Sequence, residues 1–98
     1  MEKNFMKEAL KEAKKAYAKK EIPVGAVIVK KGNIIARAHN LKETKQTALA
    51  HAEILAIQKA NKKLDNWRLI DCDIYVTLEP CNMCMGAIVS SRIKNIYI

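Results

Sequence analysis

Two short segments contain the residue types that hold a catalytic metal ion. The first is His51-Ala52-Glu53, and the second is Pro80-Cys81-Asn82-Met83-Cys84. Zinc binds thiolate and imidazole ligands, and a catalytic zinc site uses three protein ligands with the fourth position open to water. His51, Cys81 and Cys84 supply such a set, so we predict a catalytic zinc site. Zinc lowers the pKa of bound water toward neutrality, and Glu53 could take that proton and pass it on.

The spacing of these residues supports the prediction and adds a condition. Pro80 favours the start of a helix, and cysteines three apart in a first helical turn have β-carbons about 5–6 Å apart. A helix N-terminus also lowers the pKa of a thiol. His51 and Glu53 are two residues apart, so on a regular helix they point in nearly opposite directions. They can serve one site only if it lies beyond the end of their helix.

Each motif by itself also fits other roles than zinc catalysis. A lone C-x-x-C pair is also typical of a redox site or of half a zinc ribbon. A ribbon needs a second cysteine pair, and only Cys72 remains. A redox pair does not require the His-x-Glu segment. By themselves His51 would be a surface or core histidine and Glu53 an ordinary helix residue. Together the motifs favour catalytic zinc and leave Cys72 as a small buried apolar residue.

Hydrophobic periodicity predicts the elements that must position these residues. An amphipathic helix is predicted over 3–20, with Met6, Leu10, Ala13 and Tyr17 on its apolar face and the pairs Glu8–Lys11 and Glu12–Lys15 on its surface. A second helix is predicted over 48–63, with an apolar stripe of Ala50, Ile54, Ile57 and Asn61. The remaining predicted elements are strands over 24–29, 34–39, 73–78 and 95–98, a polar loop over 40–47 and a helix over about 81–91.

The order of these elements, αββαβαβ, predicts an α/β fold. The first two strands flank a short polar turn and should form a hairpin. The final strand–helix–strand unit implies a parallel crossover, so the sheet should be mixed. The first strand is apolar throughout, which is typical of a strand covered on both faces. Helices are therefore expected on both sides of the sheet.

Length and charge limit the classes of protein that fit. A chain of 98 residues predicts one domain, and 50% hydrophobic residues exclude a disordered basic tail. There is no apolar run long enough to span a bilayer and no secretory signal, so we predict a cytoplasmic location and no membrane partner. The net charge of +8, mostly from residues 1–50, favours a polyanion such as nucleic acid. Lysine-rich helix faces are, however, usually only solvated.

The two motifs together match H-x-E…P-C-x-x-C, the signature of zinc-dependent nucleobase deaminases. Longer stretches resemble the bacterial tRNA-specific adenosine deaminase family, and the resemblance covers nearly the whole chain. These stretches are Glu21–Val27, Ala50–Ile54, Asn66–Leu69, Tyr75–Cys81 and Met83–Ile88.

The resemblance implies a cytidine-deaminase-like, three-layer α/β/α sandwich that forms a homodimer. It implies deamination of adenosine to inosine at the wobble position of a tRNA anticodon stem–loop. In this scheme His51, Cys81 and Cys84 hold Zn²⁺, and Glu53 takes a proton from the bound water and protonates N1 of the base. The hydroxide attacks C6, and the amino group leaves as ammonia with a proton from Glu53. Asn40 would contact the flipped nucleotide, although by itself it would be a loop-capping residue. Backbone groups near Ala52 and Leu78–Pro80 could read the base edge.

The resemblance also bears on the extent of the domain. Members of the family continue past the fourth strand into a further strand and C-terminal helices. We therefore expect residues 1–98 to form a single zinc-dependent deaminase domain that lacks those elements.

Two alternatives remain open on the sequence. The first is a deaminase of a free base or nucleoside, namely cytosine, cytidine or guanine. The charge of +8 favours RNA over such small neutral substrates, which need no field directed at phosphates. The second is a non-catalytic, zinc-stabilised RNA-binding module, which a fourth protein ligand on the metal would support.

Overall fold

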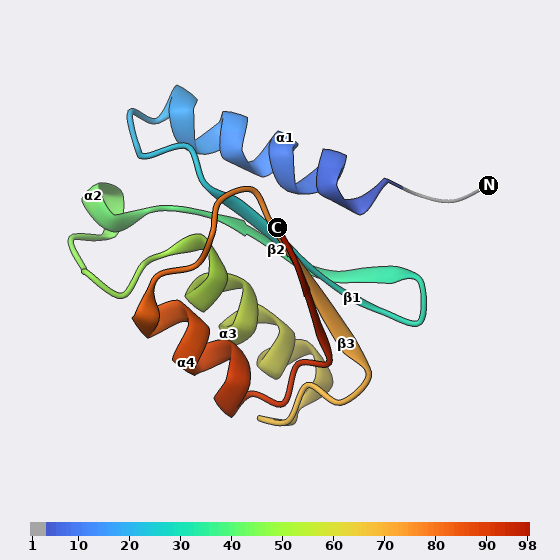
Figure 1. Cartoon of the computed structure of the whole chain (residues 1–98). Helices are drawn as coiled ribbons and strands as arrows, with labels where there is room; N and C mark the ends of the chain where they lie inside the picture. The colour runs from blue at the N-terminus through green and yellow to red at the C-terminus, as the bar shows by residue number, and fades with distance from the viewer. Residues whose placement is uncertain (1–3) are drawn as a thin grey trace.

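The computed structural model describes residues 4–98 as one mixed sheet with helices on both faces (Figure 1). The elements are α1 (Phe5–Ala18), β1 (Gly25–Lys30), β2 (Asn33–His39), α2 (Lys42–Lys45), α3 (Ala52–Leu64), β3 (Cys72–Val76), α4 (Asn82–Ser90) and β4 (Asn95–Tyr97). The predicted order αββαβαβ is confirmed, with the short helix α2 as an addition. The prediction of a loop over 40–47 was therefore wrong for Lys42–Lys45, which form α2.

The sheet has the strand order β2-β1-β3-β4. Strand β1 pairs antiparallel with β2 and with β3, which confirms the predicted hairpin. Strand β3 pairs parallel with β4, with α4 as the connection between them. The parallel crossover and the mixed sheet are therefore as predicted.

Helix α1 covers one face of the sheet, and α3 and α4 cover the other (Figure 1). The core is accordingly divided into two parts. The larger part lies between the sheet and α3 and α4, and it includes Ile28, Ile74 and Ile88. The smaller part lies under α1 and contains Ala9, Val27 and Val29. The three-layer α/β/α arrangement is thus confirmed, and β1 is buried on both faces, as its apolar sequence predicts.

The predicted helices began too early or ended too late at several points, and the backbone conformation explains why. The predicted start at residue 3 lies outside the described residues. The first helix ends at Ala18 because the chain turns at Lys20, whose φ is +62°. The second helix begins at Ala52, not at residue 48, because His51 is extended (φ −74°, ψ 151°). The third begins at Asn82, since Cys81 is also extended (φ −73°, ψ 174°).

The buried helix faces also differ from the predicted stripes. On α1, Leu10 and Tyr17 are exposed, whereas the small residues Ala9, Ala13 and Ala16 and the charged Glu12 are buried. On α3 the buried residues are Ala52, Glu53, Ala56, Ile57 and Ala60. Of the predicted stripe, Ala50 and Ile57 are buried, whereas Ile54 and Asn61 are only partly buried. The alanines on these faces let both helices lie close to the sheet.

Strand β1 begins at a residue that needs this close approach. A β-carbon on Gly25 would overlap the backbone carbonyl oxygen of Ala9 and come within 2.8 Å of the Glu12 β-carbon. Gly25 therefore sets how near α1 lies to the sheet. Within residues 4–98, no helix is both long enough and apolar enough to cross a membrane.

Candidate metal centre and pocket

The N-terminal ends of α3 and α4 meet at one place and bring the two predicted motifs together. His51 is the residue that caps α3, and Cys81 caps α4. The His51 side chain makes no capping hydrogen bond to α3, so it is free to turn toward the space between the helix ends. Cys84 lies in the first turn of α4 and is fully buried.

The three donor atoms have the geometry of a metal site. Nδ1 of His51 lies 3.4 Å from Sγ of Cys84 and 3.9 Å from Sγ of Cys81. All three ligand atoms lie within 4.8 Å of one another. A tetrahedral zinc ion with Zn–S near 2.3 Å and Zn–N near 2.0 Å separates sulfur from nitrogen by about 3.5 Å. The donor set therefore fits zinc in both chemistry and spacing.

The two thiols differ in their environment. Backbone N–H groups of Cys84 and Met83 donate to the Cys81 sulfur, and the bond from Cys84 does most to lower the pKa of the Cys81 thiol. Burial raises the pKa of the Cys84 thiol, and the nearby Glu53 carboxylate raises it further. A divalent cation between the sulfurs would favour the thiolate form of both.

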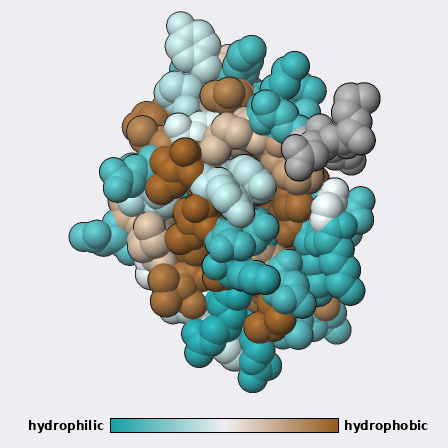
Figure 2. Space-filling view, turned by 45° about the vertical axis from the view of Figure 1, so that its right-hand side comes forward, coloured by the Kyte–Doolittle hydropathy of each residue, from teal (hydrophilic) through white to brown (hydrophobic). Residues whose placement is uncertain are grey.

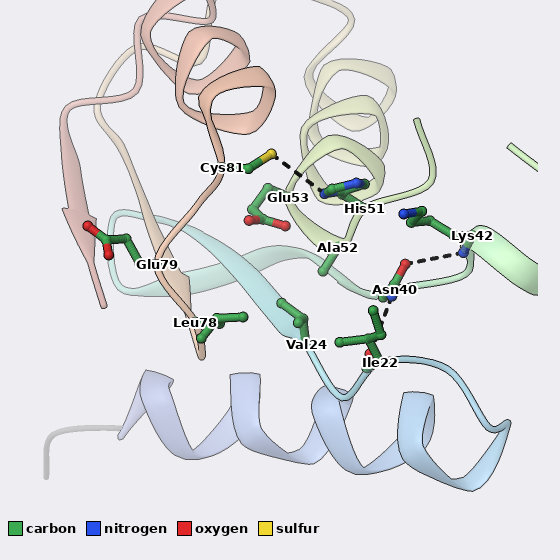
Figure 3. Close-up of a pocket in the computed structure, with 10 residues that line it drawn as sticks. All are labelled: Ile22, Val24, Asn40, Lys42, His51, Ala52, Glu53, Leu78, Glu79 and Cys81. Carbon is green, nitrogen blue, oxygen red and sulfur yellow. Dashed lines mark hydrogen bonds between the residues drawn. The ribbon is translucent and has the colours of Figure 1, made fainter. Parts of the chain in front are cut away.

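Glu53 and His51 can share one site only if it lies beyond the end of their helix, and the structure meets this condition. Glu53 is the second residue of α3, and His51 stands outside the helix, so the two side chains reach the same site beyond the helix end. Glu53 is only 4% exposed. Figure 3 shows its carboxylate between Cys81 and Ala52, directed into the pocket.

The pocket beside the donors has a volume of about 160 Å³. An apolar cavity of about 150 Å³ holds a molecule the size of benzene, so the pocket suits a flat aromatic ring. Its lining residues are Ile22, Val24, Asn40, Lys42, His51, Ala52, Glu53, Leu78, Glu79 and Cys81. Every predicted site residue except the buried Cys84 lines this pocket, and Cys84 lies directly behind it, against His51.

Asn40 is held firmly in the pocket wall. It is 5% exposed, its Nδ2 donates to the carbonyl of Ile22 over 3.4 Å, and its Oδ1 accepts from the N–H of Lys42 over 3.2 Å. The sequence patterns do not predict the contributions of Ile22, Val24 and Lys42 to this wall. No local pattern marks them, because they reach the pocket only when the segment before β1 lies against the segment after β2.

Cys72 is a buried residue of the core, as predicted from the absence of a second cysteine at metal-binding spacing from it. It is fully buried in the larger core cluster, where burial raises the pKa of its thiol. Its Sγ lies 3.6 Å from the Ile70 carbonyl oxygen. Within residues 4–98 the only group able to hold a metal is therefore His51, Cys81 and Cys84.

Comparison with known proteins agrees with this geometry. The chain is 60% identical to the tRNA-specific adenosine deaminase of Bacillus subtilis over 92 residues, which is 94% of this chain and 57% of that protein. The chain thus spans little more than half the length of this curated relative.

Two solved structures are also similar. One comes from work on A-to-I editing by tRNA:A34 deaminases (TM-score 0.93, 46% identity, 95% of this chain and 72% of that one). The other is guanine deaminase from Bacillus subtilis (TM-score 0.92, 44% identity, 95% of this chain and 60% of that one).

The family model for the cytidine and deoxycytidylate deaminase zinc-binding region matches residues 1–98. The fold, the three converging donors and this match over the whole chain lead to one conclusion: the protein belongs to the cytidine and deoxycytidylate deaminase family, in its zinc-binding region.

Proposed function

We propose that the chain is the zinc-binding core of a hydrolytic deaminase that converts adenosine to inosine at the wobble position of tRNA. The observation that carries this proposal is the placement of a buried carboxylate, Glu53, in one pocket with a zinc-type donor set. The names of the relatives support the substrate, since the Bacillus subtilis relative is a tRNA-specific adenosine deaminase.

Glu53 is the proposed proton carrier. When bound by His51, Cys81 and Cys84, zinc would make water acidic enough to supply hydroxide near neutral pH. Replacing an amino group by water's oxygen requires protons to leave water and to reach a ring nitrogen and the departing ammonia. Glu53 is the carboxylate that lies deepest in the pocket, so it can take the proton from water and deliver it to the base.

Asn40 and Ala52 are the proposed substrate contacts. Asn40 is fixed by hydrogen bonds to two segments, so it can present its remaining polar positions without losing conformational freedom on binding. Ala52 is buried at the start of α3, and Figure 3 shows its methyl group at the pocket floor. A side chain this small leaves room for a flat base beside the metal ligands.

The test is an inosine assay on an anticodon stem–loop RNA. We expect the wild-type protein to form inosine and Glu53→Gln to lose activity by a factor of about 10²–10⁴, the usual contribution of a general acid–base group. Asp71→Asn is the matched control, since Asp71 is exposed at the opposite end of β3 and asparagine tolerates its φ of +61°. Wild-type rates in Glu53→Gln would contradict the proposal.

A second candidate is deamination of a free base, favoured by the similarity to guanine deaminase. Guanine and the RNA should therefore be tested side by side with the same enzyme preparation. Turnover of guanine without inosine in the RNA would reverse the choice of substrate. A non-catalytic zinc module is less consistent with the site, because it offers three donors and Cys72 lies in the core.

We also propose a homodimer, and the surface of α4 supports it. This helix has no charged residue, yet Met83 and Val89 are 39% and 62% exposed. On the face of the molecule drawn in Figure 2, hydrophobic side chains lie among hydrophilic ones. Sedimentation velocity should give a dimer for the wild-type protein and a monomer for Val89→Asp, with Val89→Ala as the control that keeps the surface apolar. The predicted cytoplasmic location rests on the tRNA substrate.

A further inference from the structure

One wall of the pocket contains a lysine that the reaction chemistry does not use. Lys42 is the first residue of α2 and is half-buried, although lysines usually lie in solvent. Figure 3 shows its side chain running from the start of α2 toward Asn40 and His51, over the pocket. Among the described lining residues, it is the only lysine or arginine.

The backbone that carries Lys42 is held in place from a distant segment. Glu21 is 5% exposed, and its carboxylate accepts hydrogen bonds from the N–H groups of Glu43 and Thr44 and from the Thr44 hydroxyl, over 2.7–3.1 Å. The Thr44 hydroxyl is the largest of the contributions that lower the pKa of Glu21. Glu21 therefore remains ionised near neutral pH and anchors α2 against the segment before β1.

The same two segments are joined at the pocket wall itself. The N–H of Asn40 donates to the Val24 carbonyl over 3.0 Å, and the N–H of Lys42 donates to Oδ1 of Asn40. A short helix of four residues would not be stable alone. These hydrogen bonds, with those of Glu21, fix the point from which the Lys42 side chain starts.

The ammonium group of Lys42 is not neutralised within residues 4–98. Lys11 and Lys15 on α1 each form an ion pair with a glutamate at 2.9 and 2.8 Å, whereas Lys42 forms no ion pair in the described part of the chain. An unpaired cation at the edge of a pocket that fits a flat ring is suited to an anion attached to that ring.

We propose that Lys42 binds a backbone phosphate of the nucleotide whose base enters the pocket, and that Glu21 is a positioning residue that acts through α2. This inference rests on the proposed function and deepens it, because it assigns one of the many lysines to the RNA backbone. Lysine binds phosphate as a point charge. A free base has no phosphate, so this contact would favour a nucleotide within RNA over a free base.

The experiment measures binding of an anticodon stem–loop RNA by fluorescence anisotropy over a series of salt concentrations. Each phosphate contact to a single-stranded loop contributes about 0.7 to the slope of log affinity against log salt. Lys42→Gln should make this negative slope less steep by that amount. When the salt is raised from about 50 to about 200 mM, the affinity of the variant for the RNA should then fall about threefold less than that of the wild-type protein. Lys42→Arg, which keeps the charge, should restore the wild-type slope.

Two further variants separate this role from general charge and from folding. Lys45→Gln removes a charge from the same helix, but Lys45 lies beside Ala38 and Leu41 in a different hollow. It should leave the slope nearer to the wild-type value than Lys42→Gln does. Glu21→Ala should weaken RNA binding in the wild-type background but not in Lys42→Gln, while the zinc content stays that of wild type.

The outcomes that overturn the inference are distinct from failure of the proposed function. The inference is overturned if Lys42→Gln keeps the wild-type salt slope, or if Lys45→Gln reduces the slope as much as Lys42→Gln does. In either case, inosine formation by the wild-type protein would leave the proposed function intact. A wild-type protein that neither binds nor deaminates the RNA would remove the proposed function and this inference with it.

Discussion

Replacing Glu12 by glutamine should destabilise the fold, although the two side chains have nearly the same shape. Glu12 lies on α1 against β2 and is 2% exposed. Its Oε1 accepts a hydrogen bond from Nδ1 of His39 over 3.0 Å, and its Oε2 accepts one from Lys15 over 2.8 Å. Arg37 lies 3.6 Å from Oε2. Glutamine keeps one acceptor but places an NH₂ group among these donors.

The magnitude follows from the exposure of each partner. Only 11% of the His39 side chain is exposed, so losing a bond from it to a charged acceptor costs about 1.5–3 kcal/mol. Lys15 is 56% exposed and can return to water, so its pair adds only about 0–1 kcal/mol. We expect a loss of about 2–3 kcal/mol in the free energy of unfolding, or about 10–20 °C in Tm for a domain of this size.

The pH dependence supplies a second check. Burial tends to raise the pKa of Glu12, but the hydrogen bonds from Lys15 and His39 outweigh burial and hold the pKa below its ordinary value of 4.5. A carboxyl with a depressed folded-state pKa stabilises the fold above its unfolded pKa and loses this effect as the pH falls through the folded value. The difference between wild type and Glu12→Gln should therefore be full above about pH 4.5 and shrink below it.

Urea unfolding followed by circular dichroism measures both quantities. Glu8→Gln is the matched control, because Glu8 sits one turn earlier on α1 and also pairs with Arg37, but its side chain is 25% exposed. It should change the unfolding free energy much less. Zinc release at acid pH affects both proteins and cancels in the difference. Equal destabilisation by the two substitutions, or a difference that does not shrink with acid, would refute the reasoning.

Three further predictions concern packing, metal binding and the segment beside the pocket. Gly25→Ala should lower the unfolding free energy by more than about 2 kcal/mol, measured by urea titration, because the added methyl meets the Ala9 backbone, which cannot move without shifting α1. Cys84→Ser should reduce the zinc content measured by mass spectrometry, whereas Cys72→Ser should keep one zinc per chain; equal loss in both would contradict the assignment. Glu21→Ala should speed amide hydrogen exchange at Glu43 and Thr44 but not in α3, and unchanged exchange at both residues would argue against the anchoring role of Glu21.

Local sequence was sufficient to predict most of the architecture. The turn that links the first two strands, the apolar run of β1 and the strand–helix–strand unit before β4 depend on residues close together in the chain. The ion pairs Glu8–Lys11 and Glu12–Lys15 were likewise predicted from helical spacing and are present. The metal ligands were predicted from residue type and spacing, because few residue types bind zinc and the cysteine pair lies within one helical turn.

Local patterns failed where distant segments decide what is buried. The helical spacing of α1 places Leu10 on an apolar stripe, but the structure exposes Leu10 and buries Glu12. The reason is that β2 presents Arg37 and His39 to this face, and these side chains offset the cost of burying a carboxylate. Nothing within a few residues of Glu12 identifies these partners.

Residue types and their spacing along the chain are enough to identify the atoms that could bind zinc and the carboxylate that could accompany them. The packing of α3 beside α4 is not visible in the sequence. His51 and Cys81 are extended residues at the N-termini of these helices, and their meeting brings Glu53 into the same pocket. The tertiary structure also decides that Glu21 holds α2 and thereby places Lys42 at the pocket wall. The ability to bind zinc depends on residue type, which the sequence states directly. The meeting of the metal ligands, Glu53 and Lys42 at one pocket depends on how α3, α4 and the segments before β1 and after β2 pack on one sheet.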